Sequence, residues 1–189
     1  NKGISYANGE FILINNPVKT IEPDGIERLI NRMQADDSIG MIGPRLVHDD
    51  GTERTSARNY PRPFDLLVKR TMLERLFPKR LRNYLQLDAD PDAERDADWI
   101  AGGCFMMRRD FFNKLGGFDD RFFLFFEDTD LCRRCHEAKK RVVYYPAVQG
   151  TDRKSRLSEG NLWTMLTTKV GRVHAVSYTH LTLPTIAIV

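Results

Sequence analysis

Three carboxylates stand close together in the second half of the chain: Glu127, Asp128 and Asp130. They follow a run of apolar, mostly aromatic residues at 122–126 and open a segment, 131–138, whose apolar residues recur at the spacing of one helix face. An apolar wall raises the pKa of a carboxylate and keeps water away, and both properties suit a general base. Acidic side chains at a helix start also cap the helix and interact favourably with its dipole. The pattern therefore leaves a catalytic and a capping role open for this cluster.

The segments around the cluster alternate between strand and helix patterns. Short apolar runs at 11–14, 39–43 and 141–145 predict buried strands, and 25–35 predicts a helix with one apolar side. A further apolar strand at 99–107 is interrupted by two glycines, which mark a bulge or a close approach of backbone or ligand. Alternating strands and helices predict an α/β fold with a mainly parallel sheet flanked by helices.

The composition is that of an ordinary globular domain. The chain has 189 residues, of which 41% are hydrophobic and 29% charged, enough for a single core. Its net charge of +3 is too small to indicate a nucleic-acid partner. Three cysteines are too few for a disulfide framework, and Cys132 and Cys135 lack the further ligands of a zinc site, so we expect them to pack in a helix. The sequence contains no apolar run of about 18 residues, the length that predicts a membrane-spanning helix. The start at Asn1 without a methionine indicates a fragment.

The long stretch that contains the carboxylates resembles part of a known enzyme family. It reads DWIAGGCFMMRRDFFNKLGGFDDRFFLFFEDTDLCRR. Family-2 nucleotide-sugar glycosyltransferases of the rhamnosyltransferase-like branch carry similar blocks, W-x-x-G-G/A-C, G-G-F-D-E-x-F-F and F-E-D-x-D-L, in the second half of their catalytic domain. The resemblance is long and ungapped. It implies a glycosyltransferase A-type fold, a Rossmann-like sheet flanked by helices, of which residues 1–156 form an N-terminally truncated part.

The resemblance also implies an activity and the residues that perform it. The activity is the inverting transfer of a sugar, for which the branch suggests rhamnose, from a nucleoside-diphosphate sugar to a glycan or lipid-linked acceptor in cell-surface polysaccharide synthesis. The catalytic base falls on Asp128, with Glu127 beside it. The resemblance further implies that the donor or its diphosphate is bound by Asn16, Asp130, Arg153 and Lys154. It implies that the acceptor is bound by Trp99, Gly102 and Gly103. From the residues alone, Trp99 also fits a core position, and the basic residues of 153–156 fit a surface loop.

The N-terminal segment matches a second block of the family but departs from it at one functional position. The block is N-x-G-x-x-x-A-x-G-x-Y-x-x-x-L-N-P-D-T, and the residues that match in register are Asn1, Gly3, Ala7, Gly9, Asn16 and Pro17. The family's metal-binding Asp falls on Val18, which cannot bind Mg²⁺ or Mn²⁺ because these cations need oxygen donors. A His that the family often has near Thr151 is also missing. The resemblance thus implies a divalent metal, and the sequence leaves open weak coordination by Asn15 or Asn16, loss of metal use, or an error at this codon. The alternative function is a catalytically inactive, membrane-associated sugar-binding homologue.

The remaining segments give three further expectations. Residues 64–86 combine leucines with Lys and Arg, a pattern shared by a helix on an anionic membrane surface and by a helix that covers a core with its basic face in water. The membrane interpretation gives a cytoplasmic protein, peripheral on the inner face of the cell membrane. Residues 157–175 predict a C-terminal helical segment. Residues 176–189 begin VSYTHLTLPT, which reads as a translated transposase sequencing adaptor, so we expect them not to be native. The alternative for this last segment is a C-terminal edge strand.

Overall fold

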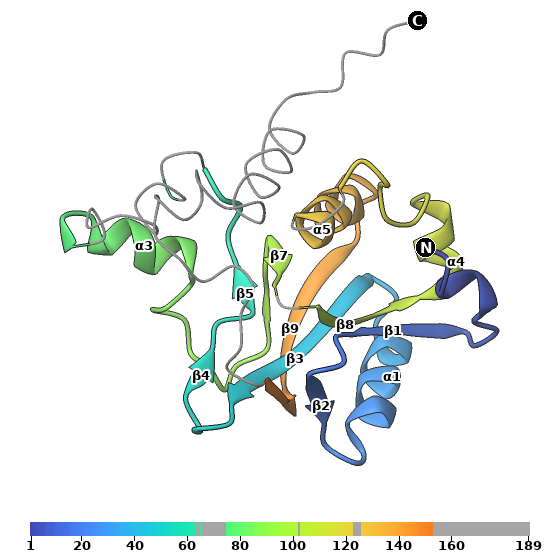
Figure 1. The fold of residues 1–189 in the computed structure, drawn as a ribbon, viewed down its shortest axis with the longest axis horizontal. Helices are drawn as coiled ribbons and strands as arrows, with labels where there is room; N and C mark the ends of the chain where they lie inside the picture. Colours follow the sequence, from blue (N-terminus) through green and yellow to red (C-terminus); the bar gives the residue numbers. More distant parts are fainter. Residues whose placement is uncertain (63–64, 66–74, 102, 123–125, 153–189) are drawn as a thin grey trace, which may run out of the picture.

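The protein is built around a mixed β-sheet with helices against both of its faces (Figure 1). The structure is a computed structural model, and it describes residues 1–62, 65, 75–101, 103–122 and 126–152. The strands of the main sheet are β1 (Phe11–Asn15), β2 (Lys19–Ile21), β3 (Ile39–His48), β4 (Glu53–Arg54), β6 (Arg95–Asp96), β8 (Cys104–Arg108) and β9 (Arg141–Asp152). Their central order is β1-β8-β3-β9-β2, and β4 pairs with β3 while β6 pairs with β9. A separate two-stranded sheet joins β5 (Ala57–Arg58) to β7 (Trp99–Ile100). The helices are η1 (Ile4–Tyr6), α1 (Gly25–Ala35), α3 (Pro78–Tyr84), α4 (Arg109–Lys114) and α5 (Glu127–Glu137).

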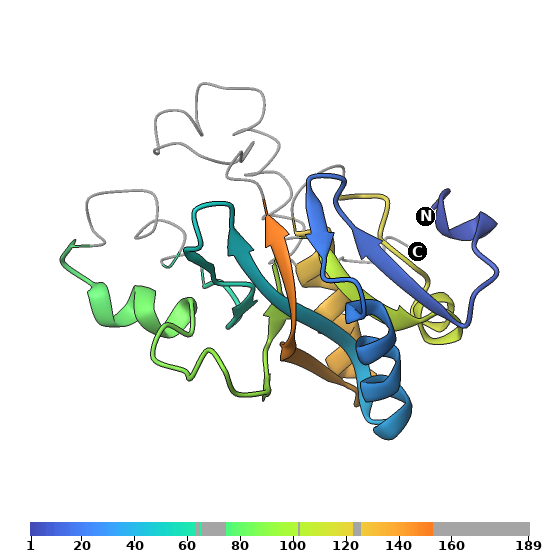
Figure 2. The ribbon, with the colours of Figure 1, turned by 90° about the horizontal axis from the view of Figure 1, so that it is seen from below.

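The main sheet is covered on both faces because successive residues of a strand point to opposite sides. In β3, Met41 belongs to the core on the α5 side, and its neighbour Ile42 belongs to the core on the α1 side. Leu29 and Met33 of α1 fill that second core and are completely buried. Figures 1 and 2 show α1 and α5 on opposite sides of β3. The predicted α/β class and the predicted helix 25–35 are therefore confirmed.

The expectation of a mainly parallel sheet is wrong for the described strands. β3 and β9 are parallel, and every other pairing in the main sheet is antiparallel. β1, for example, pairs antiparallel with β8, with Phe11 opposite Arg108 and Asn15 opposite Cys104. A short apolar run reports that a strand is buried, but it carries no information about the direction of a partner that lies far along the chain. The direction is decided by tertiary packing.

The strands β3 and β9 each continue past a proline, although the sequence predicted strands only at 39–43 and 141–145. Pro44 lies inside β3 and Pro146 inside β9. The register shifts at this level, because Pro44 faces Tyr145 whereas the next residue of β3, Arg45, faces Gln149. A proline has no N–H to give to the ladder, so it is tolerated where a bulge interrupts the pairing. Beyond this irregularity the two strands pair again, as far as His48 of β3 and Asp152 of β9.

Helix α5 ends in a turn that normally requires glycine. Lys139 follows the helix with a φ of 61°, and its N–H donates to the His136 carbonyl at 2.9 Å. The next N–H, of Lys140, donates to the Cys135 carbonyl at 3.1 Å. These two bonds form a Schellman motif, and a side chain in its left-handed position costs about 1–2 kcal/mol. Lys139 therefore holds a backbone conformation that glycine would adopt without strain.

Several expectations concern residues at the margin of the described chain or outside it. Residues 64 and 66–74 of the segment 64–86, and all of 157–175 and 176–189, lie outside the described residues. Within the described part of 64–86, Leu76 and Phe77 are 71% and 42% exposed. No helix in the described part of the chain is long and apolar enough to cross a membrane. The three cysteines are free and buried, and Cys132 and Cys135 pack in the core under α5, as predicted.

Candidate active site

The carboxylate cluster occupies the first turn of α5, where the sequence places it. The helix begins directly after Phe126, which is buried and has a φ of 65° in the left-handed region. A bulky side chain in this region is strained and persists only where its surroundings hold it, an arrangement that is common at functional sites. Because Phe126 is packed in place, it fixes the direction in which the next residues, Glu127 and Asp128, leave the backbone.

Asp128 and Glu127 are both partly buried and share a poorly solvated environment. Asp128 Oδ1 accepts a hydrogen bond from the Thr129 N–H at 2.7 Å and one from the Thr129 hydroxyl at 3.3 Å. Glu127 Oε2 is buried and has no hydrogen-bond partner among the described residues. Burial raises the pKa of Asp128, although the Thr129 N–H and the positive charge of Arg58 oppose the rise. Burial and the nearby Asp128 raise the pKa of Glu127 to about 7.

The raised pKa of Glu127 predicts a pH-dependent stability. An acid whose pKa is higher in the folded state contributes most below its unfolded value of 4.5, and this contribution is lost as the pH rises through about 7. Glu127→Gln copies the neutral form at all pH values. We therefore expect the variant to be slightly more stable than the wild type at pH 5, and its advantage in the free energy of unfolding to grow by about 1–2 kcal/mol at pH 8, after allowance for solvent screening.

Urea unfolding at the two pH values measures this difference. The matched control is Glu137→Gln, at the exposed end of the same helix, which should change the stability equally at both pH values. An equal effect of Glu127→Gln at pH 5 and pH 8 would contradict the raised pKa.

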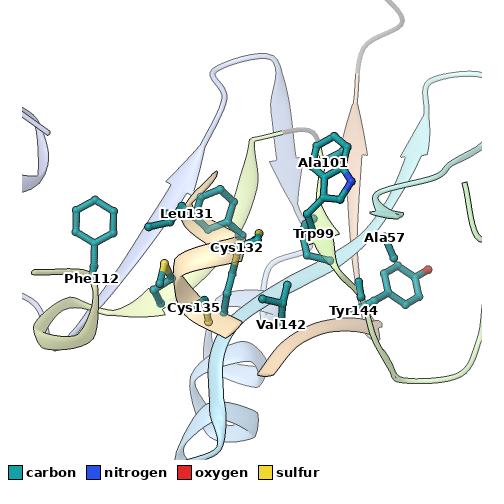
Figure 3. Close-up of a cluster of buried hydrophobic side chains, with 14 of the residues drawn as sticks. Ala57, Trp99, Ala101, Phe112, Leu131, Cys132, Cys135, Val142 and Tyr144 are labelled. Atoms are coloured by element: carbon teal, nitrogen blue, oxygen red, sulfur yellow. The ribbon is translucent and has the colours of Figure 1, made fainter. Parts of the chain in front are cut away.

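Trp99 lies in the core beneath an arginine. Its ring is 6% exposed, its Nε1–H donates to the Asn59 carbonyl at 2.9 Å, and the Arg58 guanidinium lies 5.2 Å from the ring centroid. Figure 3 shows Trp99 in the same cluster of buried apolar side chains as Cys132 of α5. These contacts describe a packed residue, so a sugar could stack on Trp99 only after Arg58 moved aside.

Arg58 lies close to the candidate base, and the sequence analysis did not connect it with Asp128 or Trp99. It is 8% exposed, faces Trp99 across the β5–β7 pair, and its charge acts on Asp128. Arg58 also influences Tyr84 through a hydrogen bond and through its charge, both of which oppose the pKa increase that burial causes in Tyr84. No local pattern signals this position, because the pairing joins segments that are far apart in sequence.

The turn between β1 and β2 meets the glycine that precedes β8. The Asn16 N–H donates to the Gly103 carbonyl at 2.8 Å, and the Lys19 N–H closes the turn on the Asn16 carbonyl at 2.9 Å. Asn16 Oδ1 accepts the Val18 N–H at 3.2 Å. Gly103 has a φ of 59°, which favours glycine there. The structure thus brings Asn16 and Gly103 together, whereas Gly102, Arg153 and Lys154 lie outside the described residues.

Asp130 points into a network of arginines on its own helix. The residue is 3% exposed, and its two oxygens lie 3.3 Å from Arg133 and 2.8 Å from Arg134. Arg134 also donates to the carbonyls of Leu115 and Gly117, both at 2.7 Å. These contacts tie the start of α5 to the loop after α4, and they favour a positioning role for Asp130 over contact with a donor.

The residues present do not fit the divalent cation that the family resemblance implies. Val18 stands at the ligand position, is 38% exposed, and has no oxygen in its side chain. The next residue, Lys19, is a cation and is only 5% exposed. In the part of the chain that the structure describes, no group of three or more His, Cys, Asp and Glu side chains is arranged to hold a metal.

Comparison with known proteins gives the same family for the whole described region. The family model described as "Glycosyltransferase like family 2" matches residues 1–175. An N-acetylglucosaminyl-diphospho-decaprenol L-rhamnosyltransferase from Mycobacterium tuberculosis is 32% identical over 145 residues, which are 74% of this chain and 46% of that protein. Rhamnosyltransferase WbbL from Escherichia coli is 34% identical over 76 residues, which are 38% of this chain and 29% of that protein. The chain therefore spans about half the length, or less, of these relatives.

The fold agrees with a solved glycosyltransferase. The crystal structure of GalNAc-T7 with UDP, GalNAc and Mn²⁺ covers 85% of this chain with a TM-score of 0.55 at 16% identity, and 30% of that chain is matched. This likeness concerns the fold and confirms the predicted glycosyltransferase A type. On the match of the family model and the identity to the mycobacterial relative, the chain belongs to the family-2-like glycosyltransferases.

Proposed function

We propose that the protein transfers a sugar from a nucleoside-diphosphate sugar to a hydroxyl group of a glycan or lipid-linked acceptor, with inversion at the anomeric carbon. The observation that carries the proposal is the partly buried Asp128 at the start of α5, whose pKa is raised by burial. The name of the mycobacterial relative supports rhamnose as the sugar and a diphospho-polyprenol-linked acceptor as the first substrates to test.

Asp128 acts as the general base of this reaction. Its Oδ1 is engaged by Thr129, so Oδ2 takes the proton from the acceptor hydroxyl. The acceptor oxygen forms its bond to the anomeric carbon as the bond from that carbon to the diphosphate breaks, and the diphosphate leaves with the electron pair. A base with a raised pKa accepts a proton more readily than an ordinary carboxylate, which favours this step near neutral pH.

Glu127 and the glycine turn complete the acceptor side. The buried Glu127 Oε2 can accept or, when protonated, donate one hydrogen bond to an acceptor hydroxyl. The backbone at Gly103 carries no side chain, so a sugar can approach it closely. Asn16 lies on the neighbouring turn, where the donor's diphosphate would bind, and Gly102, Arg153 and Lys154 stay predictions of the family resemblance.

A transfer assay tests the proposal. The purified protein is incubated with deoxythymidine-diphospho-rhamnose and a polyprenyl-diphospho-N-acetylglucosamine acceptor, and the product is examined by mass spectrometry and by NMR of the new anomeric carbon. We expect a product one rhamnose heavier whose anomeric configuration is opposite to that of the donor. A product that keeps the donor's configuration would exclude direct displacement with Asp128 as base.

Val18 favours a second candidate function, a sugar-binding homologue without catalysis, because the family's metal ligand is replaced by an apolar side chain. Such a protein would bind the donor and the acceptor but give no product in the same assay with any donor of a nucleoside-diphosphate sugar panel. The exposed Leu76 and Phe77 support contact with the inner face of the membrane in either case.

A further inference from the structure

We propose that Arg58 is a positioning residue of the transfer reaction: it keeps the negative charge of two adjoining carboxyl groups on Asp128 and leaves the proton of the pair on Glu127. The inference rests on the proposed function for the role of Asp128 as the general base. It deepens that function, because it names the group that decides which of the two carboxyl groups can take a proton from the acceptor.

The guanidinium of Arg58 is fixed in place next to the start of α5. Its Nε–H donates to the Thr55 carbonyl at 3.2 Å, and its central carbon lies 5.2 Å from the centroid of the Trp99 ring. The Tyr84 hydroxyl is a further hydrogen-bond partner. Arg58 is 8% exposed, so solvent screens its charge only weakly. A buried guanidinium held from several sides is a fixed source of positive charge for a neighbouring carboxylate.

Helix α5 turns Asp128 toward the strands that carry this guanidinium. Asp128 and Cys132 are four residues apart and therefore lie on one face of the helix. Cys132 belongs to the same buried cluster as Trp99 and Ile100, and its thiol accepts a hydrogen bond from the Ile100 N–H. Figure 1 shows β7 beside α5, and Arg58 faces Trp99 across the β5–β7 pair. The helix face that carries Asp128 thus packs against the strand pair that carries Arg58.

The two carboxyl groups at the start of α5 have different charged neighbours. Asp128 is acted on by the positive charge of Arg58, which opposes the increase that burial causes in its pKa. Glu127 is acted on by the negative charge of Asp128, and burial together with this charge raises its pKa to about 7. A cation favours the ionised form of an acid, whereas a second carboxylate disfavours it. At neutral pH the charge of the pair therefore belongs to Asp128.

Two further titratable groups near Asp128 are neutral. Tyr84 of α3 and Cys132 of α5 both interact electrostatically with Asp128. Burial raises the pKa of the Tyr84 hydroxyl and of the Cys132 thiol above their ordinary values, so neither carries a charge at neutral pH. Arg58 and Glu127 are therefore the neighbours that set the charge of Asp128.

Carbon-13 NMR of the side-chain carboxyl groups tests the inference without any transfer reaction. The signals of Asp128 and Glu127 are assigned from their absence in Asp128→Asn and Glu127→Gln and are followed from acidic to alkaline pH. Because the two groups interact, the pair titrates in two steps. In the wild type we expect the Asp128 signal to change in the step at lower pH and the Glu127 signal to change in the step at about pH 7.

Substitution of Arg58 should alter these two steps. Arg58→Met removes the charge and keeps an apolar stem beside Trp99, so the lower step should move up by about one pH unit and Asp128 should share the upper step. Arg58→Lys restores a positive charge and should restore the wild-type order. If the Met variant does not fold, Arg58→Gln takes its place, since it lacks the charge but can still donate to the Thr55 carbonyl.

Arg95→Met is the matched control. The guanidinium of Arg95 also covers an aromatic ring, at 4.1 Å from the Tyr144 centroid, but it belongs to β6, which pairs with β9. This variant loses a stacked arginine elsewhere in the fold and should leave both titration steps unchanged. Circular dichroism confirms that each variant is folded before its titration is compared.

The transfer assay separates an electrostatic role of Arg58 from a structural one. If Arg58 acts through the charge of Asp128, Arg58→Met should move the acidic limb of kcat/KM up by about one pH unit. The rate on that limb then falls about tenfold, while the rate at the alkaline plateau stays close to that of the wild type. Arg58→Lys should recover the limb. A loss of equal size at every pH would show a structural defect and contradict the inference.

Three NMR results would also overturn the inference: a wild type in which Glu127 takes the lower step, charge-free variants that titrate like the wild type, or an Arg58→Lys variant that titrates like Arg58→Met. The titration needs no sugar donor, so its outcome is separate from that of the proposed function. Absence of rhamnose transfer together with an Arg58-dependent titration would reject the activity and leave the charge on Asp128. Transfer that depends on Asp128, together with a titration that does not depend on Arg58, would do the reverse.

Discussion

Asp128→Asn should lower the rate of sugar transfer by about 10²–10⁴-fold, the range expected for loss of a general base, while the fold is kept. Asparagine has nearly the same shape as aspartate, and its Oδ1 can still accept the Thr129 N–H that Asp128 accepts at 2.7 Å. The amide cannot take a proton from the acceptor hydroxyl at neutral pH. The loss should therefore appear in kcat, and pyrophosphate affinity should remain that of the wild type.

The pH dependence of the reaction gives a second readout for the same residue. Burial raises the pKa of Asp128, so the base is protonated and inactive over a wider acidic range than an ordinary aspartate. We expect wild-type kcat/KM to rise with pH through a midpoint above the usual aspartate value, and this limb to be absent from the residual activity of Asp128→Asn. A limb that persists in the variant would show that another group is the base.

Asp110→Asn is a matched control for this prediction. Asp110 stands in the first turn of α4, is exposed, and accepts the next N–H, of Phe111, at 2.6 Å. It thus shares the local geometry of Asp128 without its burial. A similar loss of transfer in both variants would show that any aspartate at a helix start has this effect. The assignment of Asp128 as the general base would then be wrong.

Asp130→Ala should lower the free energy of unfolding by about 3–5 kcal/mol, as expected when one partner of a buried ion pair is removed. Asp130 is 3% exposed and lies 2.8 Å from Arg134, which also holds the carbonyls of Leu115 and Gly117. Without the carboxylate, the guanidinium loses its ion-pair partner and stays among carbonyl groups, with the charge of Asp119 still acting on it. The loop between α4 and α5 would then lose its attachment to the helix start.

Urea unfolding with a double-mutant cycle of Asp130→Ala and Arg134→Ala measures this coupling. The double variant should be less destabilised than the sum of the single ones, because it leaves no unpaired charge. Arg133→Ala is the control: this side chain is 45% exposed and should cost about 1 kcal/mol or less. A small stability change in Asp130→Ala, accompanied by weaker pyrophosphate binding, would instead support the donor contact that the family resemblance implies.

The sequence by itself determined the features that depend on neighbouring residues. Helix α1 follows from the apolar period of its own segment, and Leu29 and Met33 are buried as that period predicts. The placement of Glu127, Asp128 and Asp130 in one helical turn follows in the same way. The left-handed turn at Lys139 likewise depends on backbone hydrogen bonds within the helix end itself. The family itself was readable from contiguous blocks.

The tertiary structure decided what depends on segments far apart in the chain. It set the antiparallel direction of β1 against β8, the bulge that carries β9 past Pro146, and the position of Arg58 over Trp99. It also brought Lys19 to Gly103, a contact that no spacing in the sequence announces. The physical reason is that local patterns report propensity and burial, whereas strand partners and the charges around a buried group are selected by long-range packing.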